Sequence, residues 1–241
     1  MLSVENIFFE LQNKKLLVIF PHPDDETMAA GGLILTAKKL RFKVTVLILT
    51  KGGAGQLHIH PKGKTTKQVR TLELEKAVKI LGVDKLLLED FDDGKLREQK
   101  EDWSKKVIEV IKNENPGIVV TFDHSGWTGH PDHIVSSMEV KKLLSTKFSK
   151  LILLWPVIDP DGKKWMNGEV REIMPKANLK LNLTNPTRLK LYLAACSYKS
   201  QRFSDKKLMP ILRIILGWRE EWYHRVDFSK IYKHKFVKFD I

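Results

Sequence analysis

Residues 16–26 read LLVIFPHPDDE, and this stretch decides the fold class of the chain. Five apolar residues are followed at once by a polar run with one histidine and three carboxylates. A short apolar run that stops at prolines and acidic residues is typical of a buried strand that ends in a loop. Ligands of open α/β sheets bind at such strand ends. The alternative interpretation is an acidic helix N-terminus, where carboxylates stabilise the helix dipole.

Strand-like and helix-like segments alternate along the chain beyond this stretch. We expect strands at residues 16–20, 44–49, 85–88, 118–122 and 151–155. We expect helices between them, at residues 27–40, 67–81, 103–112 and 130–144. Strands that alternate with helices indicate βαβ units. The predicted fold class is therefore α/β, with a Rossmann-like, mainly parallel sheet flanked by helices.

The domain organisation follows from the absence of repeats, linkers and low-complexity segments in the sequence. We expect a single domain over residues 1–241, with a core at about 14–156 and an irregular C-terminal extension at about 157–241. Within the extension, a further strand at 179–183 and a helix at 187–196 are compatible with the pattern. The glycine-rich turn at 52–55 is not G-x-G-x-x-G and does not open a helix directly, so a dinucleotide or P-loop site is not expected.

Composition restricts the class of protein further. Lysine and arginine number 42 against 29 acidic residues, which gives a net charge of +13. The sequence carries no zinc-finger spacing, RNP motif or helix-turn-helix pattern, so no nucleic-acid partner is expected. Cys196 is the only cysteine, which excludes an internal disulfide and a cysteine-based zinc site. No signal-peptide pattern and no run of about 20 apolar residues is present, which favours a cytoplasmic protein without a transmembrane segment.

Two segments of the C-terminal extension leave alternatives open. Residues 208–218 mix apolar side chains with Arg213, so the segment can pack in the core, bind a partner subunit or make peripheral membrane contact. Trp222 and Tyr223 stand beside two glutamates, where they can stack on a carbohydrate or belong to a final strand.

A second polar cluster, HPDH at residues 130–133, follows the predicted strand at 118–122 and a glycine-bearing loop. His22 and Asp25 are three residues apart, and so are His130 and His133, a spacing that lets side chains converge on a helical turn. Two histidines and a carboxylate from two strand-end loops are the ligand set of catalytic zinc or non-haem iron. A helix N-terminus would explain a proline and an aspartate at 131–132, but not two histidines on one face.

More acidic groups stand in these clusters than a metal ion requires. Asp24, between His22 and Asp25, is free to act as a general base on a metal-activated water. We expect neighbouring cations and hydrogen bonds to keep Asp24 ionised near neutral pH. Asp132 can orient an imidazole and fix its tautomer.

The two motifs resemble those of the LmbE-like, or PIG-L, family of zinc-dependent N-acetylglucosaminyl deacetylases, which carries H-P-D-D-E after its first strand and H-P-D-H after a later one. Further similarity is present in Arg70-x-x-Glu73, in the turn F-D-D-G at 91–94 and in Ser200-Gln201, so the resemblance covers residues of about 16–201. It implies that His22, Asp25 and His133 hold Zn²⁺, with Fe²⁺ or another divalent ion as the alternative. Asp24 would be the general base.

The same resemblance implies roles for the remaining candidates. His130 would stabilise the oxyanion or protonate the leaving amine, with Asp132 orienting it. The positions that match substrate-contacting residues of the family are Arg70, Asp93, Tyr198 and Gln201. Many bacterial members have histidine where this chain has Tyr198, so we expect the phenol to alter which substrate is accepted.

The resemblance implies a hydrolase that removes an N-acetyl group from an N-acetylglucosamine-containing small molecule. The alternatives are an amidase for another N-acyl amide, such as a thiol glycoside conjugate, a non-haem iron oxygenase, or a sugar- or metal-binding protein without catalysis. Relatives are often trimers or hexamers, so a homo-oligomer is compatible with the resemblance.

Overall fold

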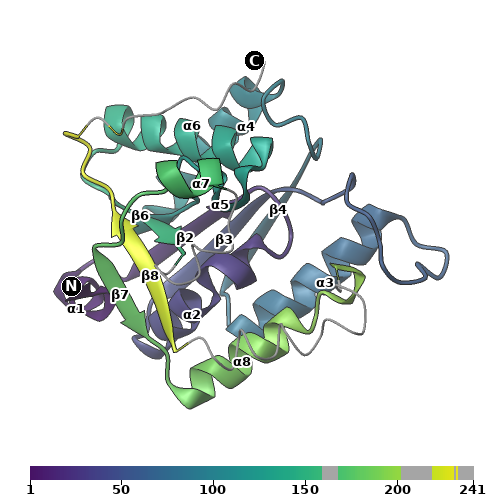
Figure 1. The fold of residues 1–241 in the computed structure, drawn as a ribbon, viewed down its shortest axis with the longest axis horizontal. Helices are drawn as coiled ribbons and strands as arrows, with labels where there is room; N and C mark the ends of the chain where they lie inside the picture. The colour runs from purple at the N-terminus through teal and green to yellow at the C-terminus, as the bar shows by residue number, and fades with distance from the viewer. Residues whose placement is uncertain (159–167, 202–218, 231, 233–241) are drawn as a thin grey trace.

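The computed structural model describes residues 1–158, 168–201, 219–230 and 232, in which the chain forms a central sheet covered by helices on both faces (Figure 1). Five neighbouring strands are parallel and form one side of the sheet, with β4 at its edge: β2 (Lys15–Phe20), β3 (Lys43–Thr50), β4 (Lys85–Phe91), β5 (Ile118–Val120) and β6 (Ile152–Val157). Each apolar run that was expected to form a strand does so. The α/β class with a mainly parallel sheet is confirmed.

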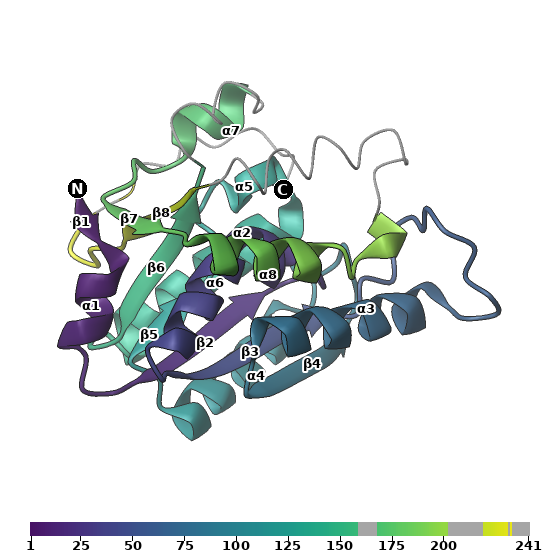
Figure 2. The ribbon, with the colours of Figure 1, turned by 90° about the horizontal axis from the view of Figure 1, so that it is seen from below.

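The two faces of the sheet bury separate apolar clusters. One face is covered by α1 (Val4–Glu10), α2 (Asp25–Lys39), α3 (Thr66–Leu81) and α8 (Asn185–Ala195). The other face is covered by α4 (Lys100–Glu114) and α6 (Pro131–Lys147) (Figure 2). Shorter helical segments are α5 (Gly126–Gly129), α7 (Gly168–Ile173) and the 3₁₀ turn η2 (Lys199–Gln201). Among the described helices, none is both long enough and apolar enough to cross a membrane.

The C-terminal part of the chain is more regular than expected, because it extends the central sheet. Strand β8 (Glu220–Arg225) pairs antiparallel with β6 and with β7 (Leu179–Asn182), and β7 pairs in parallel with the short β1 (Leu2–Ser3). The complete order is β1-β7-β8-β6-β5-β2-β3-β4. Trp222 and Tyr223 therefore belong to the last strand of the described part of the chain, and Tyr223 is fully buried. Residues 208–218 lie outside the described part of the chain.

Helix α2 is anchored to the added strand by a half-buried carboxylate. Glu221 of β8 accepts the backbone N–H groups of Gly32 at 2.7 Å and Leu33 at 2.9 Å. A Cβ atom at position 32 would lie 2.5 Å from a Glu221 carboxylate oxygen, so only glycine permits this approach. The hydroxyl of Tyr223 donates to the same carboxylate at 2.6 Å. Burial raises the pKa of Glu221 to about 7.

Strand order places a crevice beside the first motif. From β2 the chain continues to β3 and β4 on one side, whereas β5 lies on the other side of β2. In open α/β sheets, ligands bind outside the carboxyl ends of the strands at such a reversal of strand order. The two polar clusters follow β2 and β5, so the fold brings them to one place.

Candidate active site

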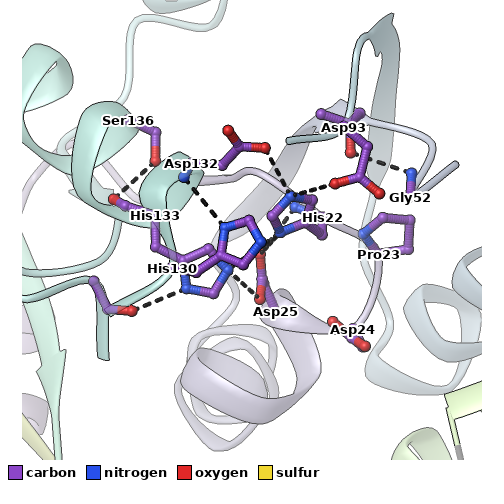
Figure 3. A network of polar contacts seen from close by, with 12 residues as sticks. His22, Pro23, Asp24, Asp25, Gly52, Asp93, His130, Asp132, His133 and Ser136 are labelled. Atoms are coloured by element: carbon purple, nitrogen blue, oxygen red, sulfur yellow. Dashed lines mark hydrogen bonds and ion pairs between the residues drawn. The ribbon is translucent and has the colours of Figure 1, made fainter. Parts of the chain in front are cut away.

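The two polar clusters meet at the carboxyl ends of β2 and β5, where α2 begins at Asp25 and α6 begins at Pro131 (Figure 3). A pocket of about 570 Å³ opens there. All but one of the residues singled out from the sequence line it: His22, Asp24, Asp25, Arg70, Asp93, His130, His133, Tyr198 and Gln201. The exception is Asp132, which is buried behind the histidines with 1% of its surface exposed.

His22, Asp25 and His133 present three ligand atoms to one another. His22 Nδ1 lies 3.2 Å from His133 Nε2, and the two carboxylate oxygens of Asp25 lie 3.6 Å from the former and 3.5 Å from the latter. Ligands at about 2.0–2.1 Å from a tetrahedral zinc ion are separated by roughly 3.3 Å. The three separations are therefore compatible with a shared metal ion, and we call these three side chains the candidate metal-binding set.

Polar contacts on the other edge of each imidazole orient His22 Nδ1 and His133 Nε2 toward each other and toward Asp25. His133 Nδ1 faces the carbonyl oxygen of Gly126 at 2.9 Å, and because a carbonyl only accepts, this nitrogen carries the proton. His133 Nε2 is then unprotonated and points at His22. Gly126 has a φ of 64°, and a Cβ there would lie 2.9 Å from the Cβ of His133, so a glycine is needed for the close approach.

His22 is held by carboxylates on its other edge. Its Nε2 atom lies 3.0 Å from Asp93 and 3.1 Å from Asp132 (Figure 3). Burial lowers the pKa of His22, but the hydrogen bonds to Asp132, Asp25 and Asp93 outweigh it and raise this pKa well above its ordinary value. The surroundings of the ring thus favour positive charge, whether carried by a proton or by a coordinated cation. Metal-bound histidines typically donate their other N–H to a carboxylate in this way.

The contacts of Asp132 correct one expectation, and those of Asp93 add a second contact to the expected one. Asp132 was expected to orient His130, but its carboxylate contacts His22 and accepts the backbone N–H groups of Gly94 at 2.8 Å and Leu96 at 3.1 Å. The reason is that residues two apart at the start of a helix point in different directions. Asp93 was expected to bind substrate; it contacts His22 and accepts the N–H of Ala54 at 2.9 Å, while still lining the pocket.

Asp24 stands at the N-cap of α2, but its side chain does not cap the helix. The carboxylate instead accepts from Arg70 Nη2 at 2.9 Å and reaches the pocket. Burial raises the pKa of Asp24 to about 8, against the opposing effect of Arg70, and the nearby Asp25 and Glu26 add to the rise. This rise in pKa runs against the expectation that neighbouring cations and hydrogen bonds keep the Asp24 carboxylate ionised near neutral pH. A divalent cation bound beside it would supply the missing positive charge.

His130 lines the same pocket, and its imidazole ring is neutral. It is the N-cap of α6, and its Nδ1 accepts the backbone N–H of Asp132 at 3.2 Å, so in the neutral ring the proton is on Nε2. Ligand atoms of His22, His130 and His133 all lie within 4.8 Å of one another. Burial lowers the pKa of His130, and His22 and His133 lower it further. The ring is thus an N–H donor beside the metal-binding set.

Tyr198 and Glu26 form a buried pair beneath the first motif. The Tyr198 hydroxyl donates to Glu26 at 2.5 Å, and Glu26 also accepts the backbone N–H of Asp24 at 3.1 Å. Tyr198 stands at a position that was expected to contact substrate, where the phenol was expected to alter which substrate is accepted. That oxygen is taken by Glu26, so only the remainder of the side chain is left to line the pocket.

The Ser200-Gln201 pair is fixed by helix α3. Glu73 of α3 accepts the backbone N–H of Ser200 at 2.7 Å and its hydroxyl at 2.5 Å. Gln201 lines the pocket and donates weakly to the carbonyl of Gln56 at 3.3 Å. The structural contact between Glu73 and Ser200 was not foreseen, although both residues belong to the motifs that carried the resemblance.

The fold and the site together define an α/β protein with clustered histidine and aspartate side chains at the switch point of its sheet. Among the described residues, two groups present possible metal-ligand atoms within 4.8 Å of one another: His22, His130 and His133, and His22, Asp93 and Asp132. The chain belongs to the family described as PIG-L: GlcNAc-PI de-N-acetylase, which matches residues 17–144. That range contains both motifs. The family resemblance noted from the sequence is confirmed.

Individual relatives agree with this membership. A probable N-acetyl-alpha-D-glucosaminyl L-malate deacetylase 2 of Bacillus anthracis is 31% identical over 137 residues, which are 55% of this chain and 60% of the relative. The diacetylchitobiose deacetylase of Thermococcus kodakarensis is 37% identical over 121 residues, 50% of this chain and 45% of the relative. The chain thus spans about half the length of these curated relatives.

Solved structures support the fold over nearly the whole chain. The N,N'-diacetylchitobiose deacetylase from Pyrococcus horikoshii superimposes with a TM-score of 0.72 at 22% identity, covering 99% of this chain and 91% of that one. At this identity the likeness concerns the fold alone. The C-terminal elements beyond the family match therefore belong to the same architecture.

Proposed function

We propose that this protein is a metal-dependent hydrolase that removes the N-acetyl group from an N-acetylglucosamine-containing small molecule. The observation that carries the proposal is that one nitrogen each of His22 and His133 and the carboxylate of Asp25 converge at 3.2–3.6 Å. The carboxylate of Asp24 and the N–H donor of His130 line the same pocket. Family membership supports the same reaction, and the relatives named above are deacetylases of N-acetylglucosaminyl compounds.

His22 Nδ1, Asp25 and His133 Nε2 would hold the metal, with zinc as the ion that their donor atoms and spacing suit best. When bound, zinc supplies a Lewis acid that polarises the acetyl carbonyl and lowers the pKa of a water. Asp93 and Asp132 keep His22 oriented and electron-rich through its Nε2–H.

The chain's own groups move the protons of the reaction. Asp24 accepts a proton from the attacking water, since its carboxylate faces the pocket and Arg70 fixes its direction. His130 Nε2–H donates to the carbonyl oxygen as negative charge develops on it. The C–N bond then breaks, and Asp24 returns its proton to the departing amine. The products are acetate and the free amino sugar.

Substrate contacts are proposed for side chains around the rest of the pocket. Gln201 offers an amide to sugar hydroxyls, and Asp93 has a partly exposed carboxylate beside the metal-binding set. Met28, Trp127 and Tyr198 supply apolar surface on which a sugar ring can lie. Arg70 acts through Asp24, since its Nη2 atom is already bonded to Asp24 and to the carbonyl of Pro23.

The test is a metal analysis combined with an acetate-release screen. Protein stripped by a chelator and reloaded with zinc is incubated with N-acetylglucosamine, diacetylchitobiose, and N-acetylglucosaminyl inositol and malate compounds. We expect one zinc per chain and acetate release from at least one compound, abolished by stripping. Zinc-loaded protein that binds these compounds but releases no acetate from any would support the non-catalytic alternative. Thiol-conjugate amides are incubated in parallel, with the free amine as the product measured; cleavage of these amides alone would support the amidase alternative.

A further inference from the structure

Asp24, the proposed base, has an unusual backbone conformation. Its φ is 97°, a left-handed value that residues other than glycine adopt only when their surroundings enforce it. An aspartate at a helix N-cap ordinarily accepts an N–H of its own first turn, whereas this side chain makes no such bond. The positive φ therefore accompanies a carboxylate that is turned away from its helix toward Arg70 and the pocket.

The side chain of Glu26 accepts a hydrogen bond from the backbone of Asp24 in this conformation. One Glu26 oxygen accepts the Asp24 N–H at 3.1 Å, and the other accepts the hydroxyls of Thr27 and Tyr198, each at 2.5 Å. Glu26 has no exposed surface, so its carboxylate has no water to replace a lost partner. Its orientation depends on these two hydroxyls.

Tyr198 reaches this carboxylate from a distant part of the chain. It follows α8 and is separated from Glu26 by 172 positions, yet only 5% of its surface is exposed. The contact ties the C-terminal segment to the loop that carries the base. We propose that Tyr198 is a positioning residue for Asp24, acting through Glu26. The inference rests on the proposed function, because it concerns the group assigned as the base.

The metal-binding set does not depend on this link. Asp25 is oriented by the backbone N–H of His22 at 2.9 Å, and His133 by the carbonyl of Gly126. Removal of the Tyr198 hydroxyl would leave Glu26 with Thr27 as its only hydroxyl donor. The Asp24 backbone would then relax from its positive φ and carry its carboxylate away from the pocket. Catalysis should fall while metal affinity stays the same.

The chain offers a matched control for the test. Tyr223 is also buried and donates to a carboxylate, the half-buried Glu221, at 2.6 Å, but that pair anchors the middle of α2 and does not line the pocket. Tyr198→Phe and Tyr223→Phe thus remove the same kind of hydrogen bond at two places. We would measure kcat, KM, zinc affinity by chelator competition, and amide hydrogen exchange of residues 24–27 by NMR.

We expect Tyr198→Phe to lower kcat on the order of tenfold to 100-fold, the effect of a misplaced catalytic group, with KM and zinc affinity little changed. Exchange of the Asp24 amide should accelerate in Tyr198→Phe and not in Tyr223→Phe. Equal loss of kcat in both variants, or unchanged exchange at Asp24, would overturn the inference. If Tyr198→Phe does not fold, Thr27→Val removes the other hydroxyl and should give the same pattern more weakly. Should no substrate be found for the wild-type protein, the proposed function fails, and the exchange measurement still decides whether Tyr198 holds Asp24.

Discussion

The substitution Asp132→Asn tests which imidazole this buried carboxylate serves. Its Oδ2 atom lies 3.1 Å from His22 Nε2 and accepts the N–H of Gly94 at 2.8 Å, and its Oδ1 accepts the N–H of Leu96 at 3.1 Å. Asparagine has one acceptor oxygen where aspartate has two. The amide group must therefore turn N–H atoms toward a donor, and His22 loses one of its two charged partners.

The size of the effect follows from those contacts. Loss of a partner that orients a metal-bound histidine typically weakens metal binding about 10- to 100-fold, which is roughly 1.4–2.7 kcal/mol. Asp93 remains on the same nitrogen at 3.0 Å, so we expect the lower end, about tenfold. His130 contacts residue 132 only through the backbone N–H, which asparagine retains. The kcat of the zinc-saturated variant should therefore change little.

The assay is competition for zinc with a chromophoric chelator, followed by kcat at saturating zinc. Asp93→Asn is the companion variant, and the double variant should bind zinc more weakly than either single one because both charged partners are gone. Unchanged zinc affinity together with a large loss of kcat would refute the assignment to His22. That outcome would restore the role first expected from the sequence, in which Asp132 orients His130.

Three further outcomes are expected from the same structure. Asp24→Asn should keep one zinc per chain but lose on the order of 10²- to 10⁴-fold in initial rate, as expected for removal of a general base; a full-rate variant would contradict this role. His133→Ala should lose metal, so its zinc content after dialysis should fall well below one per chain; normal zinc content would show that another group is the ligand. Glu221 has a pKa raised by burial from 4.5 to about 7, so the stability that its neutral form contributes is complete below pH 4.5 and is lost as the pH rises through 7. Glu221→Gln should flatten the fall of the unfolding free energy over that range by up to about 3 kcal/mol, measured by urea titration at several pH values, and parallel curves for both proteins would contradict it.

The five neighbouring parallel strands were predictable because each is a short apolar run bounded by polar residues. Strand β8 was harder to predict, since its sequence EEWYHR has two glutamates and a histidine. One of them, Glu221, is half-buried, and Gly32 and Leu33 of α2 donate backbone N–H groups to its carboxylate. Such a contact joins residues 189 positions apart and leaves no local pattern in the sequence.

The candidate site was predictable as a set of residues but not as a set of contacts. The spacing of His22 and Asp25, and of His130 and His133, indicates convergence because both motifs follow strands of one sheet. Spacing does not reveal which imidazole Asp132 contacts. Its carboxylate is held by the N–H groups of Gly94 and Leu96, so its direction depends on the path of the turn after β4. The raised pKa of Asp24 was not foreseen either, because it comes from burial and from neighbours supplied by α2.

The central claim is that His22, Asp25 and His133 hold a catalytic metal ion, and anomalous diffraction at the zinc edge from crystals of the zinc-loaded protein tests it most directly. The account predicts one anomalous peak per chain, bonded to His22 Nδ1, His133 Nε2 and Asp25, with Asp24 and His130 beside it but outside the coordination sphere. A peak coordinated by Asp93 and Asp132, a peak bonded to His130 in place of Asp25, or no peak at the pocket would contradict it.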